Sequence, residues 1–398
     1  MTAKPHGDPS CGFGKEDTVM NKFYLRSRIY FGENALEALS RVKSKCTVVV
    51  TDAFIKSTGT ADRVASMITG AEQVHIFSEI QPDPPVDLIA KALDFLLNVG
   101  ADTVIALGGG SSIDAAKATV LIYEQKTGTR VKLYAVPTTS GTGSEVTDFS
   151  VVTDPEAGKK YPLVSESLLP DVAILAGELT VSVPPAVTAA TGFDVITHAL
   201  EAYISTNAND FTDAFAEKAL ELAFTYLLTA YKEGDNLKAR EKMQTASCLA
   251  GMAFNDAGLG VNHGIAHALG AVFHIPHGKA NAMVLYHVMK YNAELESVRF
   301  GEEPNRVCNR LARIARFIHR PAFTKQQGAI NLLNEISRLT KEMGIPQTLG
   351  EAGIKEVDYL EKRAHIIESA VQDACTATNP RPIDAAAVEA ILKGIEKF

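Results

Sequence analysis

The sequence predicts a chain of two parts, an α/β N-terminal domain followed by an all-α C-terminal domain. Short β-branched runs such as CTVVVTD (46–52) alternate with amphipathic stretches such as VDLIAKALDFLLNVG (86–100) as far as about residue 181. This alternation indicates a mostly parallel sheet with helices on both faces. After the two prolines at 184–185, long stretches rich in Ala and Leu follow, and β-branched runs become rare. We therefore expect a disordered N-terminal extension and two domains, over residues 1–20, 21–182 and 183–398.

Each element has its own local pattern. The stretch 86–100 places Ile89, Leu93 and Leu96 on one helical face and ends at a glycine, which is typical of a helix C-cap. The run DTVIALGGG (102–110) predicts a strand and a turn, and the helix after it is expected to begin with a serine cap at Ser111. A further strand is expected from 133, before a loop of small residues. The helices expected in the second domain are 186–205, 210–232, 237–255, 260–272 and 280–294, followed by mostly helical stretches from 305 to the end.

Composition narrows the class of protein. The formal net charge of −8 and the lack of clustered Lys and Arg argue against binding to nucleic acid. No apolar run approaches the roughly 20 residues that a membrane-spanning helix needs. The five cysteines are widely separated and never form a C-x-x-C pair, which fits free thiols in a reducing compartment. We expect a cytoplasmic enzyme.

Two loops of small residues follow two of the predicted strands. The first, residues 108–111 (GGGS, the glycine loop), stands where backbone N–H groups and a helix N-terminus stabilise a phosphate. The second, residues 138–144 (TTSGTGS, the threonine loop), adds hydroxyl groups with little bulk. Two such loops at adjacent strand ends could enclose a dinucleotide, although a glycine turn is often only a turn. Asp52, at a strand end, would favour NAD over NADP, or would simply cap a helix.

Two histidine-bearing segments predict a metal site. Asp194 and His198 are four residues apart in a helical pattern, so both side chains leave one face and can chelate one ion. A second segment, 258–281, holds four of the ten histidines in the chain: His263, His267, His274 and His277. A buried aspartate among histidines needs a compensating cation. The spacing alone delivers two half-sites and leaves open which histidines of the second segment are ligands.

The type of site is narrowed by what the segments contain. His263 and His267 have the spacing of a zinc protease helix, but Gly264 stands where that motif requires glutamate. No cysteine is near, which excludes the Cys-Cys-His site of zinc alcohol dehydrogenases. Aspartate and neutral imidazoles suit Fe(II), Zn(II), Ni(II) or Co(II) better than Mg(II) or Ca(II).

Taken together, four stretches resemble the iron-dependent (group III) alcohol dehydrogenases over essentially all of residues 22–398: ALGGGSSIDAAK, PTTSGTGSEVT, TGFDVITHALEAY and GLGVNHGIAHALGAVFHIPHGKANAM. Within that family, KYPLVSESLLPDVAIL and the late TNPRP are most similar to the propanol dehydrogenases of propanediol-utilisation systems. The resemblance implies the dehydroquinate synthase-like fold of this family, with a dinucleotide-binding α/β domain and a helical metal domain.

The resemblance also implies roles for individual residues. Asp194, His198, His263 and His277 would hold the metal, Fe(II) or in some members Zn(II). His267 would be a catalytic residue near the ion, and Asp114 would lie by the substrate pocket. His274 matches no ligand of the family, so we expect it to be structural or to support the ligands. The residues implied to line the NAD site are Asp52, Asp83, Gly109, Gly110, Ser111, Thr138, Thr139, Thr142, Thr147 and Lys160, with Phe254 near the nicotinamide.

The resulting hypothesis is an NAD(H)-dependent dehydrogenase that interconverts small alcohols and aldehydes, such as 1-propanol and propanal or their ethanol-like analogues. Three alternatives stay open: a dehydroquinate synthase-like lyase, a metallohydrolase whose glycine loops are mere turns, and a structural metal protein. The resemblance further implies a homodimer or higher homo-oligomer. It offers a bacterial microcompartment as an alternative location within the cytoplasm.

Overall fold

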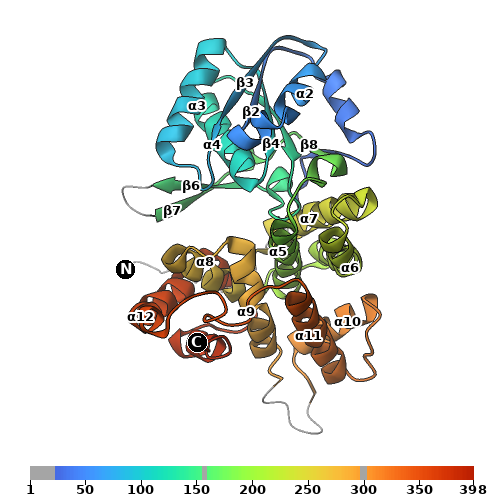
Figure 1. The fold of residues 1–398 in the computed structure, drawn as a ribbon, viewed down its shortest axis with the longest axis vertical. Coiled ribbons are helices and arrows are strands. Elements are labelled where there is room, and N and C mark those ends of the chain that lie inside the picture. Colours follow the sequence, from blue (N-terminus) through green and yellow to red (C-terminus); the bar gives the residue numbers. More distant parts are fainter. Residues whose placement is uncertain (1–22, 155–158, 296–302) are drawn as a thin grey trace, which may run out of the picture.

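A computed structural model describes residues 23–154, 159–295 and 303–398, so the expected N-terminal extension lies outside the described residues. The N-terminal part contains one six-stranded sheet, at the top of Figure 1, in which every neighbouring pair of strands is parallel. The predicted parallel sheet is thus confirmed. In spatial order its strands are β1 (Arg28–Phe31), β8 (Val172–Leu175), β5 (Lys132–Pro137), β4 (Thr103–Gly108), β2 (Ser44–Asp52) and β3 (Ala71–Ile80).

Both faces of the sheet are covered, as expected. Val48 and Val50 of β2 point into one core with α3 (Val86–Val99) and α4 (Gly110–Thr127). Val49, between them, points into the opposite core with η1 (Ala35–Arg41) and α2 (Thr60–Ser66). Successive side chains of a strand leave opposite faces, so a continuous apolar run is what a strand buried on both sides requires.

Two local features differ from the sequence prediction. The serine cap of α4 was wrong: the helix begins at Gly110 with Gly109 as the N-cap, and no side chain caps it. A glycine cap leaves the backbone N–H groups of the first turn without a side-chain acceptor from the cap residue. A two-stranded antiparallel hairpin, β6 (Phe149–Asp154) with β7 (Lys159–Val164), also lies beside the main sheet and was not anticipated.

In the described residues of the C-terminal part every secondary-structure element is a helix, which confirms the predicted class. Its helices are α5 (Pro185–Ile204), α6 (Asp210–Lys232), α7 (Leu237–Ala257), α8 (Val261–Phe273), α9 (His277–Asn292), α10 (Arg306–Phe317), α11 (Lys325–Glu342), α12 (Glu356–Gln372) and α13 (Ala385–Leu392), with the short 3-10 helix η5 (Ala374–Thr378). Helix α5 is buried along most of its length and contributes to the largest core. Among the described helices, none is long and apolar enough to cross a membrane.

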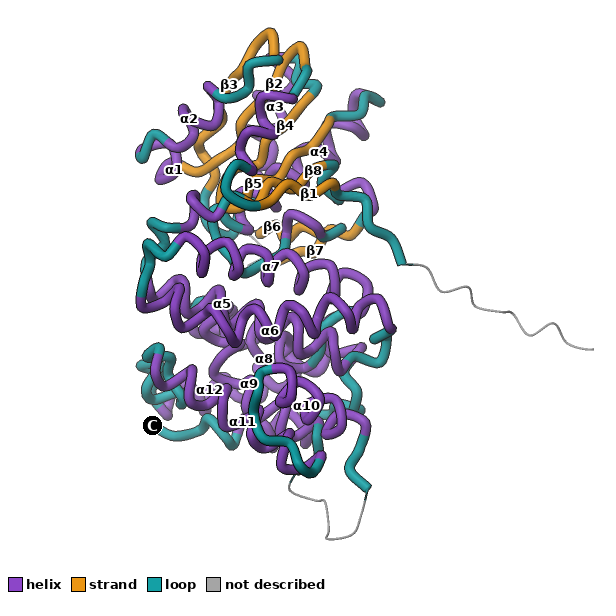
Figure 2. The backbone as a smooth tube through the Cα atoms, turned by 90° about the vertical axis from the view of Figure 1, so that its right-hand side faces the viewer, coloured by secondary structure: helices purple, strands orange, loops and turns teal. Residues whose placement is uncertain are grey.

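The two parts meet where α7 lies under the sheet (Figure 2). Met252 and Cys248 of α7 pack against Val146 and strand β8. At Gly143, whose φ is +63°, a Cβ atom would lie 2.6 Å from the Cα of Gly251 in α7. Only glycine permits this approach, so the threonine loop is seated directly on a helix of the C-terminal part.

Candidate metal centre

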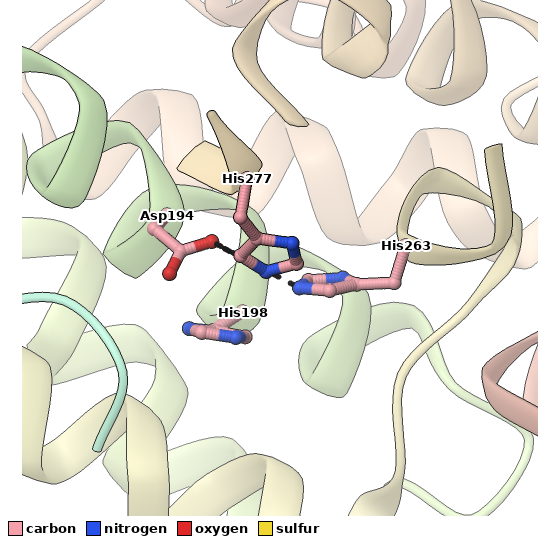
Figure 3. A group of neighbouring side chains, drawn as sticks. All are labelled: Asp194, His198, His263 and His277. Atoms are coloured by element: carbon pink, nitrogen blue, oxygen red, sulfur yellow. Dashed lines mark ion pairs between the residues drawn. The ribbon is translucent and has the colours of Figure 1, made fainter. Parts of the chain in front are cut away.

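Four side chains from three helices point toward one another (Figure 3). Asp194 and His198 come from α5, one turn apart, while His263 comes from the first turn of α8 and His277 opens α9. Each of the four side chains offers one potential ligand atom, and these four atoms all lie within 4.8 Å of one another. The Oδ1 of Asp194 lies 3.3 Å from the Nε2 of His277 and 4.0 Å from the Nε2 of His263. The structure therefore joins the two half-sites that the spacing left separate.

The charges of this cluster suit a cation. Burial raises the pKa of Asp194, but the neighbouring His277 and the hydrogen bond from Asn281 lower it to about 2, so the carboxylate is ionised. Burial lowers the pKa of His198 and His263, which keeps both imidazoles neutral. A carboxylate and neutral imidazoles are the forms in which these side chains ligate a metal.

Asn281 marks the point on which the ligand atoms converge. Its side-chain nitrogen donates to the Oδ1 of Asp194 at 2.8 Å and lies 3.2 Å from the Nε2 of His263 and 3.1 Å from that of His277. One carboxylate oxygen and two imidazole nitrogens thus surround the side-chain nitrogen of Asn281. These ligand atoms suit a divalent transition-metal ion. Sequence reasoning missed Asn281, although it follows His277 by one helical turn.

Glu201 is a second residue that the sequence analysis missed. It is buried on α5, and its Oε2 lies 2.6 Å from the Nδ1 of His263. Its Oε1 accepts from the backbone nitrogen of Asn262 at 2.7 Å. Carboxylates that bond the far nitrogen of a ligating histidine fix its tautomer and orientation. The sequence could have indicated Glu201, because it follows His198 by three residues and therefore lies about one helical turn away on α5.

Replacing Glu201 by glutamine is expected to weaken metal binding by about 10- to 100-fold, because the amide NH2 can donate to Nδ1 and move the imidazole proton to Nε2. A chelator competition titration with Zn(II) measures this. Glu217→Gln is the matched control. Glu217 lies on α6 and also accepts a short side-chain hydrogen bond, from the hydroxyl of Tyr203 at 2.6 Å, but it contacts none of the four clustered residues in the interactions described. Equal metal affinity in both variants would refute the role given to Glu201.

The other two histidines of the second segment lie outside this cluster. The ring of His267 stacks on that of His277, with centroids 5.3 Å apart, and its Nδ1 pairs with Asp373 at 2.9 Å. His274 caps the end of α8 with a left-handed backbone, φ 55°. Neither belongs to the four-residue group.

The two small-residue loops lie side by side because β4 and β5 are neighbours, and the backbone nitrogen of Thr138 donates to the oxygen of Gly108 at 2.9 Å. A Cβ at Gly109 would contact Thr139 at 3.4 Å, and one at Gly110 would clash with Thr142 at 2.7 Å. A Cβ at Gly141 would lie 2.8 Å from that of Thr191, three residues before Asp194. The loops and the metal cluster are therefore adjacent.

Asp52 serves as a helix cap in the structure. Its Oδ1 accepts from the backbone nitrogen of Ile55 at 2.8 Å, at the start of α1 (Ala53–Ser57), and its Oδ2 lies 3.4 Å from the hydroxyl of Ser112. The capping interpretation is thus observed, while the same carboxylate also borders the glycine loop. Ser111 lies in the first turn of α4, on the same loop.

The remaining predicted residues occupy different surroundings. Phe254 stacks on His198, with ring centroids 4.4 Å apart. Thr147 is buried and receives a hydrogen bond from the amine of Lys117 at 3.1 Å. Asp114 accepts from the hydroxyl of Ser144 at 2.5 Å and from the backbone nitrogen of Val151 at 3.0 Å. Asp83 is exposed, with φ 52°, and the side chain of Lys160 lies outside the described part of the chain.

Lys117 was also missed, and it holds this region together. It is fully buried, and its amine donates to the backbone oxygens of Thr147 at 2.8 Å and Phe149 at 3.0 Å. Burial lowers its pKa to about 8, against the attraction of Asp114 and Glu145. The ring of Phe149 lies 5.8 Å from that of Phe254. Lys117 thus fixes the backbone of Phe149, whose ring lies against that of Phe254 beside His198.

Comparison with known proteins gives one consistent family. The family model described as iron-containing alcohol dehydrogenase matches residues 26–176, and that described as Fe-containing alcohol dehydrogenase family, C-terminal, matches residues 188–395. The 1-propanol dehydrogenase PduQ of Citrobacter freundii is 42% identical over 377 residues, which cover 94% of this chain and 99% of the relative. The NADPH-dependent butanol dehydrogenase of Clostridium saccharobutylicum is 40% identical, over 92% of this chain and 95% of the relative.

Solved structures agree with the sequence comparisons. A 1,3-propanediol oxidoreductase superposes with a TM-score of 0.84 at 33% identity and covers 94% of this chain and 99% of its own. A sulfoacetaldehyde reductase from Bifidobacterium kashiwanohense, solved in complex with NAD+, superposes with a TM-score of 0.81 at 28% identity, over 95% of this chain and 99% of its own.

Proposed function

Because this chain belongs to the iron-containing alcohol dehydrogenase family and is a metal-dependent alcohol dehydrogenase, we propose that it interconverts small primary alcohols and aldehydes with NAD(H). The observation that carries the proposal is the convergence of Asp194 with three imidazoles next to the two small-residue loops. A metal centre and a site for a dinucleotide side by side are what hydride transfer to or from an alcohol carbon needs.

In this proposal Asp194, His198, His263 and His277 hold Fe(II), with Zn(II) as an alternative ion. When bound, the ion supplies a Lewis acid that polarises an aldehyde carbonyl and lowers the pKa of an alcohol. Glu201 orients His263, and the ring of Phe254 stacks on that of His198, which shields one face of this imidazole from water.

The cofactor site is proposed at the two loops. Gly109 and Gly110 let the threonine loop pack closely against the N-terminus of α4, where the N–H groups of the first turn would stabilise the negative charge of a pyrophosphate. Ser111, Thr138, Thr139 and Thr142 supply hydroxyl groups around it. Asp52, beside the glycine loop, favours NAD over NADP through repulsion of a 2′-phosphate. Asp83, Thr147 and Lys160 are proposed to complete the site, and Asp114 to lie at its substrate side.

His267 is proposed to exchange the proton that accompanies hydride transfer, because it lies next to His277 and is partly exposed to solvent. His267→Ala should therefore retain the metal while kcat falls by about 100-fold. The rate of NADH formation and the metal content of the purified variant test this together. His274→Asn is the control, since asparagine tolerates the left-handed backbone there. Loss of the ion in His267→Ala would instead place His267 among the ligands.

The substrate class is proposed from the relatives, of which one is a 1-propanol dehydrogenase and another a butanol dehydrogenase. Elemental analysis of protein purified without oxygen, combined with rates on a panel of aldehydes with NADH and NADPH, tests metal, substrate and cofactor at once. We expect the highest kcat/KM for propanal with NADH. Equal or better rates with NADPH would refute the role of Asp52.

The alternatives make different predictions. A dehydroquinate synthase-like lyase would use the cofactor transiently, so net NADH formation from a primary alcohol separates it from the proposed activity. A metallohydrolase would not bind NAD, which a fluorescence titration decides. We further propose two domains, over residues 21–182 and 183–398, and a homodimer or higher homo-oligomer. The proposed location is the cytoplasm, with a bacterial microcompartment as the alternative that the resemblance to the propanol dehydrogenases of propanediol-utilisation systems offers.

A further inference from the structure

A carboxylate from the far end of the chain contacts His267. The Oδ2 of Asp373 lies 2.9 Å from the Nδ1 of His267, although 106 residues separate them in the sequence. The other oxygen, Oδ1, accepts from the backbone nitrogen of Cys375 at 2.9 Å, at the start of η5. Asp373 is largely buried, with a side chain 19% exposed, whereas that of His267 is 43% exposed. Both carboxylate oxygens of Asp373 are thus engaged.

Gly264 permits this contact. A Cβ at residue 264 would lie 2.4 Å from the hydroxyl oxygen of Thr376 and 2.8 Å from the backbone oxygen of Ala370. The same hydroxyl donates to the oxygen of Ala370 at 2.7 Å, and the hydroxyl of Thr378 donates to that of Leu259 at 2.7 Å. The end of α12 and η5 are therefore held against α8, one turn from His267, because position 264 has no side chain.

The arrangement repeats one already described for a metal ligand. His263 and His267 lie one turn apart on α8, and each has its Nδ1 against a carboxylate from another element, Glu201 at 2.6 Å and Asp373 at 2.9 Å. The ring of His267 contacts those of His277 and His263, with centroids 5.3 and 5.8 Å away. With Nδ1 bonded to Asp373, the nitrogen left for chemistry is Nε2.

We propose that Asp373 is a positioning residue, which keeps the proton of neutral His267 on Nδ1 and presents an unprotonated Nε2 to the substrate side of the metal centre. The proposal rests on the proposed function, in which His267 exchanges a proton with the substrate. His267, Asp373 and Cys375 also lie close enough together to hold a metal ion. The hydrogen bonds to both carboxylate oxygens favour the histidine–aspartate pair instead.

The variant that tests this is Asp373→Asn. Asparagine keeps an oxygen to accept from Cys375, but its NH2 group faces Nδ1 and favours the opposite tautomer of His267. We expect kcat to fall by about 10- to 100-fold, with unchanged metal content and KM for NAD. Asp384→Asn is the matched control, since Asp384 caps α13 through the backbone nitrogen of Ala387 at 2.8 Å. The control should keep wild-type kcat.

A double-mutant cycle separates positioning from a structural role. In the His267→Ala background, Asp373→Asn should change kcat by no more than about twofold, because the residue through which it acts is gone. An equal loss in both backgrounds, wild-type kcat in Asp373→Asn, or a second metal equivalent that this variant loses would each overturn the proposal.

A measurement that does not depend on activity completes the test. In Zn(II)-loaded enzyme with 15N-labelled histidine, the nitrogen shifts of His267 should report the Nδ1–H tautomer in the wild type and the Nε2–H tautomer in Asp373→Asn. An unchanged tautomer overturns the positioning role. If the tautomer changes while His267→Ala keeps full activity, Asp373 does position His267, and the proton-transfer role of His267 in the proposed function is what fails.

Discussion

Asp194→Ala is expected to remove the bound metal and to lower kcat/KM for the aldehyde by on the order of 1,000-fold or more, a loss of about 4 kcal/mol of transition-state stabilisation. Asp194 is the one carboxylate of the four-residue group, and alanine leaves only the three imidazoles to hold a divalent ion. Elemental analysis and steady-state rates of aldehyde reduction measure the two effects.

The same variant should still bind NADH. The two loops proposed to hold the dinucleotide lie at the ends of β4 and β5, and their hydrogen bonds to the sheet do not involve Asp194. A fluorescence titration with NADH is the internal control, because lost binding would indicate a misfolded protein. Full metal content together with full activity would show that the proposed ligand set is wrong.

Gly278→Ala is expected to have a comparable effect without touching a ligand. A Cβ at residue 278 would lie 2.2 Å from the backbone oxygen of Ala190 and 2.7 Å from its carbonyl carbon. Backbone atoms cannot rotate away, so the start of α9 must move from α5, and His277 must move from Asp194. We expect the free energy of unfolding to fall by about 3 kcal/mol and the metal to be lost.

Gly270→Ala is the matched control for that experiment. Gly270 is also helical, in α8, but a Cβ there would meet only the backbone oxygen of Ile275, at 3.3 Å. Alanine should leave stability within about 1 kcal/mol of the wild type. Thermal unfolding and metal analysis of both variants decide the matter. A Gly278→Ala protein with wild-type Tm and metal content would mean that the two helices can separate without loss of the site.

The class of fold could be predicted from local sequence patterns, whereas the choice of the four clustered residues could not be made from spacing alone. The predicted helices of the second domain and the parallel sheet are confirmed, because their periodic patterns reflect local burial. The similarity to the iron-dependent alcohol dehydrogenases is also confirmed. Spacing alone could not rank His263 above His267, since both leave one side of α8. Their difference lies in tertiary contacts, as His263 is buried against Glu201 and His267 is half exposed against Asp373.

What sequence reasoning missed depends on contacts between distant segments. Asn281 meets His277 within α9, but it reaches His263 only after α8 and α9 have packed together, and Asp373 reaches His267 only after η5 has packed against α8. The sequence around these two residues does not mark either of them for such a contact. Gly264 was informative for the wrong reason: it was recognised as a missing catalytic glutamate, whereas the structure uses the absent side chain to admit Thr376. The serine cap failed because the chain caps α4 with Gly109 instead.

The order of the strands has a consequence for how the protein is made. The sheet is completed by β8, which inserts between β1 and β5 and ends at Leu175. A chain that emerges from the ribosome N-terminus first thus carries every strand of this sheet before Asp194 is synthesised. The last proposed ligand, His277, follows about a hundred residues after β8. The sheet can therefore form before the four proposed metal ligands come together, so its assembly does not depend on the ion.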